Sequence, residues 1–285
     1  DLALDEDRGE RAWVPFGGVD AARLRVRTDS RIELAATNLV VGFASRKRGD
    51  SGVLLLGAFL EAGRADYDTR NHFSDLESIH GDGKLRAVGG GLMARHTWGN
   101  QFRVEASLRA GRLKNEFSAR NYADENGVHA SYKFRDRYLA AHLGVGKSWQ
   151  LSEKNSVDVL LRYYWNRQEG GNVTLSSDER MRFYDDDSQR LRIGARFTHH
   201  WKENRFWYVG AAVERELDSK VNASAHDFAF DAHDFKGATG IGEIGLILRS
   251  RKNDKNSPFS LEAGLQGYAG KIRGISGGIR LGWEF

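Results

Sequence analysis

The chain has 285 residues and a formal net charge of only +4, because 43 Lys and Arg are nearly matched by 39 Asp and Glu. This balance, without a basic helix or a Cys/His finger, argues against nucleic acid as a partner. The mean hydropathy of −0.57 and the short longest apolar run, Val53–Leu60, exclude a membrane protein built of helices, since a spanning helix needs about 20 apolar residues.

Residues 1–12 are acidic and have the composition of a helix. A helix of this length spans only about 18 Å. We interpret these residues as the remnant of a longer helical linker, with a frayed tail as the alternative. No signal peptide is visible at Asp1, so we expect a leader to have been removed upstream.

From residue 13 to the carboxy terminus, apolar and polar residues alternate in long segments. For example, Phe102 and Val104 interleave with Arg103 and Glu105. The two prolines of the chain are few enough for long strands in which every N–H enters a ladder. The alternation predicts about twelve strands, near residues 13–27, 32–45, 53–64, 84–97, 101–114, 132–149, 156–168, 189–201, 205–218, 237–250, 258–269 and 272–285.

The connections between these strands alternate in length. Short turns are predicted at 46–52, 98–100, 150–155, 202–204 and 251–257, and long polar links at 65–83, 115–131, 169–188 and 219–236. Short periplasmic turns and long outer loops are typical of an outer-membrane barrel. The first and last outer loops, 28–31 and 270–271, are exceptions because they are short.

Tryptophan lies mostly on one side of this topology. Only Trp165 falls at the opposite rim, and the other six are predicted to form an aromatic girdle at one membrane interface: Trp13, Trp98, Trp149, Trp201, Trp207 and Trp283. A soluble β-sandwich that uses Trp as core filler predicts no such sidedness. The barrel interpretation is therefore favoured over a soluble all-β fold.

The last residues alternate up to an aromatic carboxy terminus. Ile279, Leu281, Trp283 and Phe285 are apolar, as the closing strand of an outer-membrane barrel requires, and we interpret them as an assembly signal. The predicted fold is an all-β, twelve-stranded antiparallel transmembrane barrel over residues 13–285, with residues 1–12 as a short helical segment in or below the lumen. The predicted location is the outer membrane of a Gram-negative bacterium, as a monomer.

Side chains on the predicted inner face are strongly charged. We expect ion pairs across the lumen, and a twelve-stranded barrel leaves a narrow lumen that passes small solutes or holds one helix but no folded protein. The acidic residues 1–12 suit such an Arg-rich interior. The predicted lumen residues are Arg103, Glu105, Arg109, Arg162, Arg192, Arg196, Glu214, Glu243, Glu262, Arg280 and Glu284.

Catalytic patterns are weak. Asp185 with Asp187, and Asp231 with His233, resemble the two pairs of the omptin proteases, but both occur late in this chain, whereas that family places the first pair early. No Ser stands beside a His in a matching strand context, as an outer-membrane phospholipase would require. With no cysteine in the chain, we expect no thiolate metal site, no other resident metal and no cofactor.

A glycine-rich pattern near the carboxy terminus resembles the autotransporter (type V secretion) β-domain. That family shows Gly-Tyr-x-Gly, Arg-Gly and further glycines between its last two strands, and here these are Gly267, Tyr268, Gly270, Arg273, Gly274 and Gly277. The stretch 13–43 resembles the opening hairpin of the family. The resemblance covers nearly the whole chain.

The resemblance implies a twelve-stranded translocator that moves an amino-terminal passenger to the cell surface while a helix threads the pore. It implies the passenger, the barrel assembly machinery, periplasmic chaperones, and outer-membrane lipid and lipopolysaccharide as partners. Some members cleave themselves at an Asn-Asn junction inside the barrel. Residues 1–20 contain no Asn-Asn, so we expect no enzyme activity here.

Two points stay open at this stage. Tyr268 is a candidate ring to lie flat on a glycine of the next strand, either Gly278 or Gly282, or else a simple filler of the lumen. A passive solute porin is the alternative function, and an omptin-like hydrolase that depends on Asp231 and His233 is a more distant one.

Overall fold

The structure is a computed structural model of the whole chain. It describes residues 11–27, 31–73, 76–123, 125–225, 228–234, 236–250 and 259–283. Within these ranges, no helix is long and apolar enough to cross a membrane. The predicted helical segment 1–12 falls mostly outside the described residues, and the first strand already begins at Arg11.

Antiparallel strands form one closed barrel in which the first strand pairs with the last. This confirms the predicted twelve-stranded fold. Going round the barrel from β1, the order is β1-β16-β15-β14-β11-β10-β7-β6-β5-β4-β3-β2. The strands are β1 (Arg11–Arg27), β2 (Arg31–Gly49), β3 (Gly52–Phe73), β4 (Leu76–Trp98), β5 (Phe102–Ala123), β6 (His129–Ser152), β7 (Asn155–Gln168), β10 (Asp186–Lys202), β11 (Arg205–Asp218), β14 (Gly237–Arg249), β15 (Phe259–Gly270) and β16 (Ile272–Trp283).

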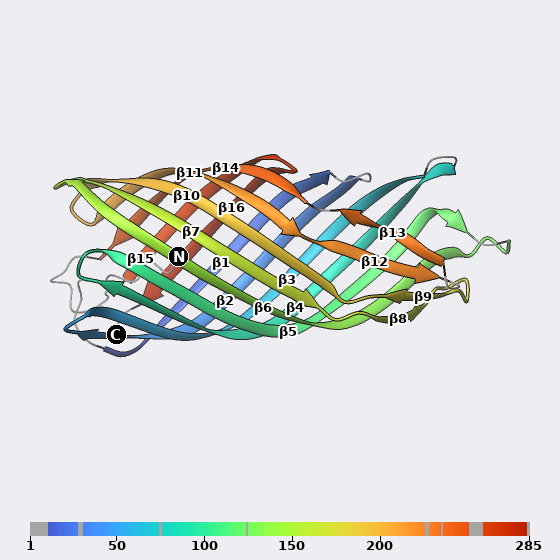
Figure 1. Ribbon diagram of the computed structural model, residues 1–285, viewed down its shortest axis with the longest axis horizontal. Coiled ribbons are helices and arrows are strands. Elements are labelled where there is room, and N and C mark those ends of the chain that lie inside the picture. The colour runs from blue at the N-terminus through green and yellow to red at the C-terminus, as the bar shows by residue number, and fades with distance from the viewer. Residues whose placement is uncertain are drawn as a thin grey trace.

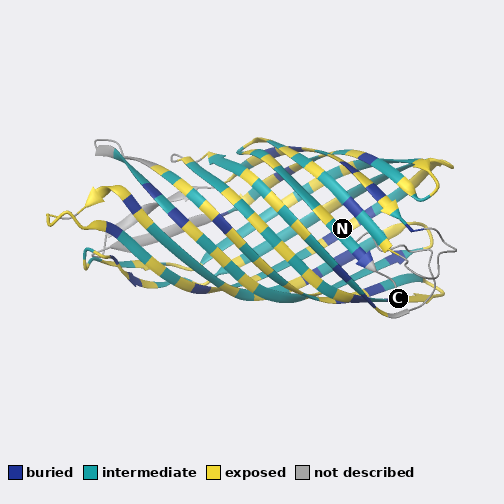
Figure 2. Cartoon of the chain, turned by 180° about the vertical axis from the view of Figure 1, so that it is seen from behind, coloured by how far each residue is buried: buried dark blue, intermediate teal, exposed yellow. Residues whose placement is uncertain are grey.

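The period-2 pattern sorts side chains between an apolar exterior and a polar lumen. Leu60, Leu92 and Ile275 are 66%, 66% and 67% exposed on the outside of the wall. Charged neighbours on the other face, such as Glu105 and Glu262, are buried. The alternating exposure along the coloured strands that face the viewer in Figure 2 shows this pattern. An exposed apolar band around a polar interior is the arrangement that a lipid bilayer stabilises.

The two ends of the barrel differ (Figure 1). Tight turns join β2 to β3, β4 to β5, β6 to β7 and β10 to β11 at one end, and residues of β1 near Arg11 lie at that end because Arg11 pairs with Arg46. At the opposite end β3–β4 and β5–β6 run on as long hairpins. Residues 65–83 and 115–131 were predicted as polar links, and that prediction was wrong, because almost all of them continue the ladder.

The other two predicted links also contain strands. Residues 169–188 include β8 (Gly171–Thr174) and β9 (Arg180–Phe183), and residues 219–236 include β12 (Lys220–Ala225) and β13 (Phe228–Asp234). These four short strands pair with one another in the order β13-β12-β9-β8 and project from the end opposite the tight turns (Figure 1). The two hairpins thus form a small sheet beyond the barrel.

Rings that lie on glycines recur in the lumen wall. Tyr138 lies in one row with Gly111 and Gly89 on the next two strands, and a Cβ at either glycine would meet the ring. Tyr208 is placed in the same way across Gly245 and Gly264. Because glycine leaves the backbone bare, a flat ring covers two strands and the sheet can curve sharply.

Candidate functional site

Charged side chains line the lumen of the barrel. A cavity of about 850 Å³ runs along it and reaches the tight turns, since Gln101 and Lys154 are among its lining residues. Arginine dominates the lining, with fewer acids among it. The arginines are Arg95, Arg103, Arg162, Arg192, Arg196, Arg249 and Arg280, and the acids are Glu153, Asp158, Glu243 and Glu262.

Glu105 is the centre of one buried ion network. Its carboxylate accepts from the Arg162 guanidinium and lies 3.3 Å from Nη2 of Arg95, and the residue is 5% exposed. Since β4, β5 and β7 supply these three residues, the network spans several strands of the wall. Arg103 adds a further pair, 3.0 Å from Asp158. A buried carboxylate with two cations is held tightly because its loss would leave them uncompensated.

A second network lies beside the first, since Arg196 of β10 pairs in register with Asp158 of β7. Arg196 is 2.7 Å from Glu243 and 3.5 Å from Glu262, and Arg280 is 3.7 Å from Glu262. The Arg196 guanidinium also stacks on the Tyr208 ring, 4.0 Å from its centroid. Residues from β10, β14, β15 and β16 are therefore tied together on one side of the lumen.

Three further predicted lumen residues, Arg109, Arg192 and Glu214, also lie in ion pairs. Arg192 is 2.7 Å from Glu214, and Arg109 is 3.2 Å from Glu61, which sequence reasoning did not single out. Glu61 also accepts a hydrogen bond of 2.5 Å from the Tyr138 hydroxyl. Its lumen position was readable from the period-2 pattern of β3. Glu284 lies outside the described residues.

The glycine-rich motif occupies the β15–β16 hairpin. Gly267 and Gly277 lie on the outer face, and Arg273 donates to the Gly270 carbonyl oxygen at 3.4 Å. Gly270 and Gly274 have φ of 130° and 140°, which L side chains rarely adopt. These positions let the short hairpin turn between strands.

Tyr268 does not lie on Gly278. Its hydroxyl donates to Gln266 at 2.7 Å and lies 3.1 Å from Ser276, within the lumen. A Cβ at Gly278 would meet Asp20 instead. The ring that covers glycines in this part of the wall is Tyr208, because the register brings Gly245 and Gly264 into its row.

The predicted girdle residues lie on strand ends near the tight turns. Trp13, Trp149 and Trp201 are 59%, 44% and 56% exposed on the outer wall. Trp98 contacts the Phe102 ring across its turn, and Trp207 contacts Phe197 on the neighbouring strand.

The closing strand carries its apolar residues outward. Ile279 is 47% exposed and pairs with Val19 of β1, and Leu281 pairs with Gly17. The backbone of Trp283 pairs with Phe259, while Phe285 lies outside the described residues. The predicted assembly signal therefore sits at the seam where the barrel closes.

One Ser-His pair escaped sequence analysis. Ser107 and His142 are direct cross-strand partners, with Oγ 2.6 Å from Nδ1, and the other ring nitrogen is 3.9 Å from Glu105. The statement that no Ser stands beside a His in matching strands was therefore wrong, because the pairing depends on the β5–β6 register. Ser107 is buried in the lumen wall and faces away from lipid, and Glu105 is already bound to arginines.

The acidic pair at the start of β10, Asp185 just before the strand and Asp187 within it, is an ion-pair site. Arg167 lies 2.6 Å from Asp185 and 3.8 Å from Asp187, and the Gly170 N–H donates to Asp185 at 2.9 Å. The Gly170 N–H and then the Arg167 guanidinium hold the pKa of Asp185 below its usual value, the opposite of what a proton-accepting dyad near neutral pH needs. The side chains of Asp231 and His233 lie outside the described residues. No group of three metal-ligating side chains occurs among the residues described.

Twelve antiparallel strands, an apolar exterior and a charged lumen define a transmembrane β-barrel. The family model described as "Autotransporter beta-domain" matches residues 13–251, and the chain belongs to this family. The match ends before β15 and β16, which carry the glycine-rich motif. The chain is an outer-membrane translocator domain of a Gram-negative bacterium.

Solved autotransporter barrels share the fold at low sequence identity. The β domain of the Bordetella autotransporter BrkA is 15% identical, with a TM-score of 0.71 over 96% of this chain and 100% of that chain. The translocator domain of NalP from Neisseria meningitidis is 16% identical, with a TM-score of 0.73 over 98% and 91%. The transport unit of AIDA-I from Escherichia coli is 12% identical, with a TM-score of 0.68 over 100% and 93%. No curated protein matches the chain in sequence.

Proposed function

We propose that the lumen conducts an amino-terminal passenger from the tight-turn end of the barrel to the opposite end, and that residues 1–12 are the last part of its linker. The carrying observation is charge complementarity. The cavity lining has seven arginines and one lysine against four acids, whereas residues 1–12 have five acids against two arginines. An acidic linker is attracted into a passage of this sign.

The position of β1 supports the same route. Arg11 lies at the tight-turn end, where the cavity opens, so a segment that precedes it meets the mouth of the lumen. The ion networks of Glu105 and of Arg196 lie along the wall, and their fixed pairing keeps most charges from trapping a passing chain. This mechanism needs no cofactor and no chemical step, and it includes no cleavage of the junction.

Assembly of the barrel is the second part of the proposal. Ile279, Leu281, Trp283 and Phe285 act as the signal by which the barrel assembly machinery receives the chain from periplasmic chaperones. The outward position of Ile279 at the closing seam supports this role. Outer-membrane lipid and lipopolysaccharide then surround the exposed apolar band of a monomeric barrel.

Surface delivery of a passenger tests the proposal. An epitope-tagged segment is fused between a signal peptide and residue 1, and protease is added to intact cells. We expect the tag to be cleaved on the surface. The matched control lacks residues 272–285, which removes the closing strand, and its tag should stay protected. A folded barrel whose tag remains periplasmic would contradict translocation.

A passive porin is the second candidate, because the cavity reaches the tight-turn end. It predicts stable open-channel conductance of the purified barrel in a planar bilayer and no surface delivery of the tag. A translocator whose lumen is held by its linker predicts conductance that rises when residues 1–10 are removed. The two measurements together separate the candidates.

A further inference from the structure

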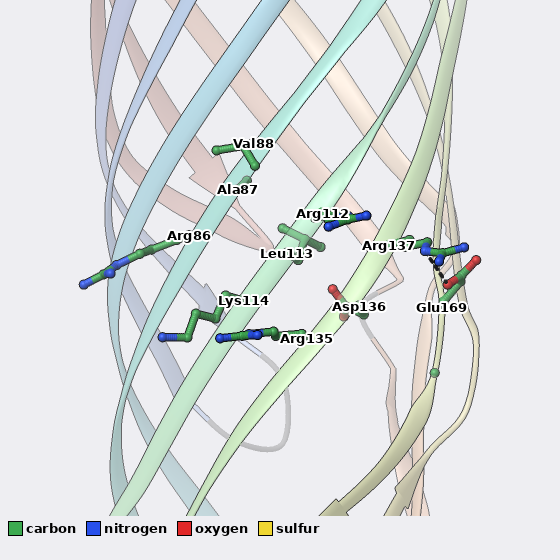
Figure 3. Close-up of a pocket in the computed structure, with 11 residues that line it drawn as sticks. Arg86, Ala87, Val88, Arg112, Leu113, Lys114, Arg135, Asp136, Arg137 and Glu169 are labelled. Carbon is green, nitrogen blue, oxygen red and sulfur yellow. Dashed lines mark ion pairs between the residues drawn. The ribbon is translucent and has the colours of Figure 1, made fainter.

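Five cations from three neighbouring strands meet on the outer wall, next to Arg64 of β3, which pairs in register with Arg86 and lies 3.2 Å from Asp66. Arg86 of β4 pairs in register with Lys114 of β5, and Lys114 pairs with Arg135 of β6. In the next row Arg112 pairs with Arg137. Figure 3 shows Arg86, Lys114 and Arg135 extending in the same direction from their strands. We call these five residues the basic cluster.

This arrangement is unfavourable without an anion. Like charges directly opposite each other in a sheet destabilise it. Two members have an acidic partner within 4.0 Å: Lys114 pairs with Glu116, and Arg137 lies 4.0 Å from Glu169. Arg86, Arg112 and Arg135 make no ion pair within 4.0 Å with any residue that the structure describes. The cluster therefore carries excess positive charge that a bound anion would neutralise.

The cluster lies where lipid headgroups meet the barrel. Toward the tight turns, the next outward residue after Arg86 is Val88, which is 59% exposed, and after Arg137 it is Leu139, 39% exposed. On β4 the apolar band runs from Val88 to Trp98. The ten residue-to-residue steps from Val88 to Trp98 span about 33 Å along the strand, or about 25 Å across a membrane at the usual tilt of about 40°. The apolar band therefore ends at Trp98 on one side of the membrane and at the basic cluster on the other.

We propose that the basic cluster binds the phosphate groups of a phosphorylated lipid of the outer leaflet, whose acyl chains lie on Val88 and Leu139. The side chains line a depression of about 750 Å³ together with Val88, Asp136 and Glu169 (Figure 3). Arginine suits phosphate because its planar fork donates two parallel hydrogen bonds. Several arginines within one depression suit a lipid with more than one phosphate. The site is independent of passenger transport.

Other outward cations of the same end provide a matched comparison. Arg23 pairs in register with Ala35 and Ile275, and Arg215 pairs with Leu191 and Ala238. Arg215 is thus a single cation between apolar neighbours, whereas Arg23 has Arg25, itself paired with Glu33, two residues along the same face, and both lie outside the cluster. Removing these two takes away the same charge as removing two members of the cluster but leaves the cluster intact.

Lipid retention by the purified, folded barrel tests the site. Native mass spectrometry in detergent is run with hexa-acylated lipid A that carries two phosphates and with the same lipid dephosphorylated. We expect the wild type to retain the bisphosphorylated form. Arg112→Gln/Arg135→Gln should weaken its apparent affinity at least tenfold, since each cation near an anionic lipid surface contributes about fivefold. Arg23→Gln/Arg215→Gln should change it less than twofold.

Three outcomes would overturn the site. They are equal loss in the two double variants, equal retention of the dephosphorylated lipid, and displacement of the lipid by inorganic phosphate at equal concentration, which would indicate an ion site without lipid. Arg112→Lys/Arg135→Lys keeps the charge and should retain more binding than the glutamine variant. Unchanged heat-modifiable migration in electrophoresis establishes that each variant is folded.

Discussion

At the scale of single residues, the barrel wall depends on glycines, whose missing side chains leave room for aromatic rings. Tyr208 covers Gly245 and Gly264, and its hydroxyl side is directed toward the carboxylates of the lumen, while Arg196 stacks on its face. The ring therefore joins backbone packing to the ion network. Tyr138 has the same combination, with two glycines in its row and Glu61 on its hydroxyl.

Filling one of these glycines should destabilise the barrel. A Cβ at Gly245 would meet the Tyr208 ring and a backbone carbonyl, so Gly245→Ala should cost about 1–3 kcal/mol through overpacking. The unfolding midpoint of the refolded barrel in urea measures this. Gly242→Ala on the same strand is the control, because nothing lies within 4 Å of its Cβ position. Equal midpoints for the two variants would refute the packing role.

Glu105 should be the most sensitive acid of the lumen. Glu105→Gln leaves the guanidiniums of Arg95 and Arg162 without their shared carboxylate, so we expect a loss on the order of 3 kcal/mol. Urea unfolding is again the measurement. Glu33→Gln, which breaks an exposed pair with Arg25, should leave the midpoint unchanged. A larger shift from Glu33→Gln than from Glu105→Gln would argue against the buried network.

The sequence pattern predicted on which face of the sheet these residues lie, but it did not predict which residues they contact on the neighbouring strands. The lumen position of Tyr268 follows from period 2, yet its partner depends on how far β15 is displaced along β16. The same is true of Ser107 and His142, which meet only because residues 107 and 142 share a row. A register is set jointly by both strands and their turn, and no single-strand pattern encodes it.

At the scale of elements, the strands were predictable wherever lipid imposes an apolar face. The tight turn after Arg48 and the start of β11 at Arg205 agree closely with the pattern. Beyond the bilayer, residues 65–70 alternate Ala65, Tyr67 and Thr69 inward with charges outward. Because water replaces lipid there, the outward face loses its apolar signal, and the strand resembles a polar loop.

The small sheet at that end should be dispensable for folding. β8, β9, β12 and β13 pair among themselves, while the barrel ladder is complete without them. Replacing residues 171–183 and 220–234 with short Gly-Ser turns should preserve heat-modifiable migration and surface delivery of the tag. Replacing residues 115–123, which belong to a barrel strand, is the contrasting variant. Loss of folding in the first variant would show that the sheet stabilises the barrel.

The residues at the end of β16 should affect assembly of the barrel in cells more than the stability of the folded barrel. Deleting Phe285 should lower the amount of barrel in the outer membrane of cells about tenfold or more, while the refolded protein keeps its urea midpoint, since one terminal side chain contributes little burial. Ile275→Ala, at the far end of the same strand and 67% exposed, is the control and should not impair assembly. Equal effects in cells would contradict the proposed signal.

At the scale of the whole molecule, the lumen sets the width of what passes. Its cavity of about 850 Å³ is divided by paired side chains, so an extended segment or one helix fits and a folded domain does not. A passenger closed by an engineered disulfide should therefore stall, with its upstream part protected from added protease. Addition of reductant should restore delivery, and a Cys→Ser passenger should pass throughout. Delivery of the oxidised passenger would require a wider pore.

The pairing of β1 with β16 determines when the barrel can close. Val19 of β1 can pair with Ile279 only after β16 has been made, so the ring cannot close before then. At about 5–20 residues per second, synthesis of 285 residues takes about 15–60 seconds. Throughout that interval the long edge of β1 offers unpaired N–H and C=O groups to any neighbouring strand. The topology therefore requires the cell to keep the edge of β1 from pairing with other strands until β16 is available.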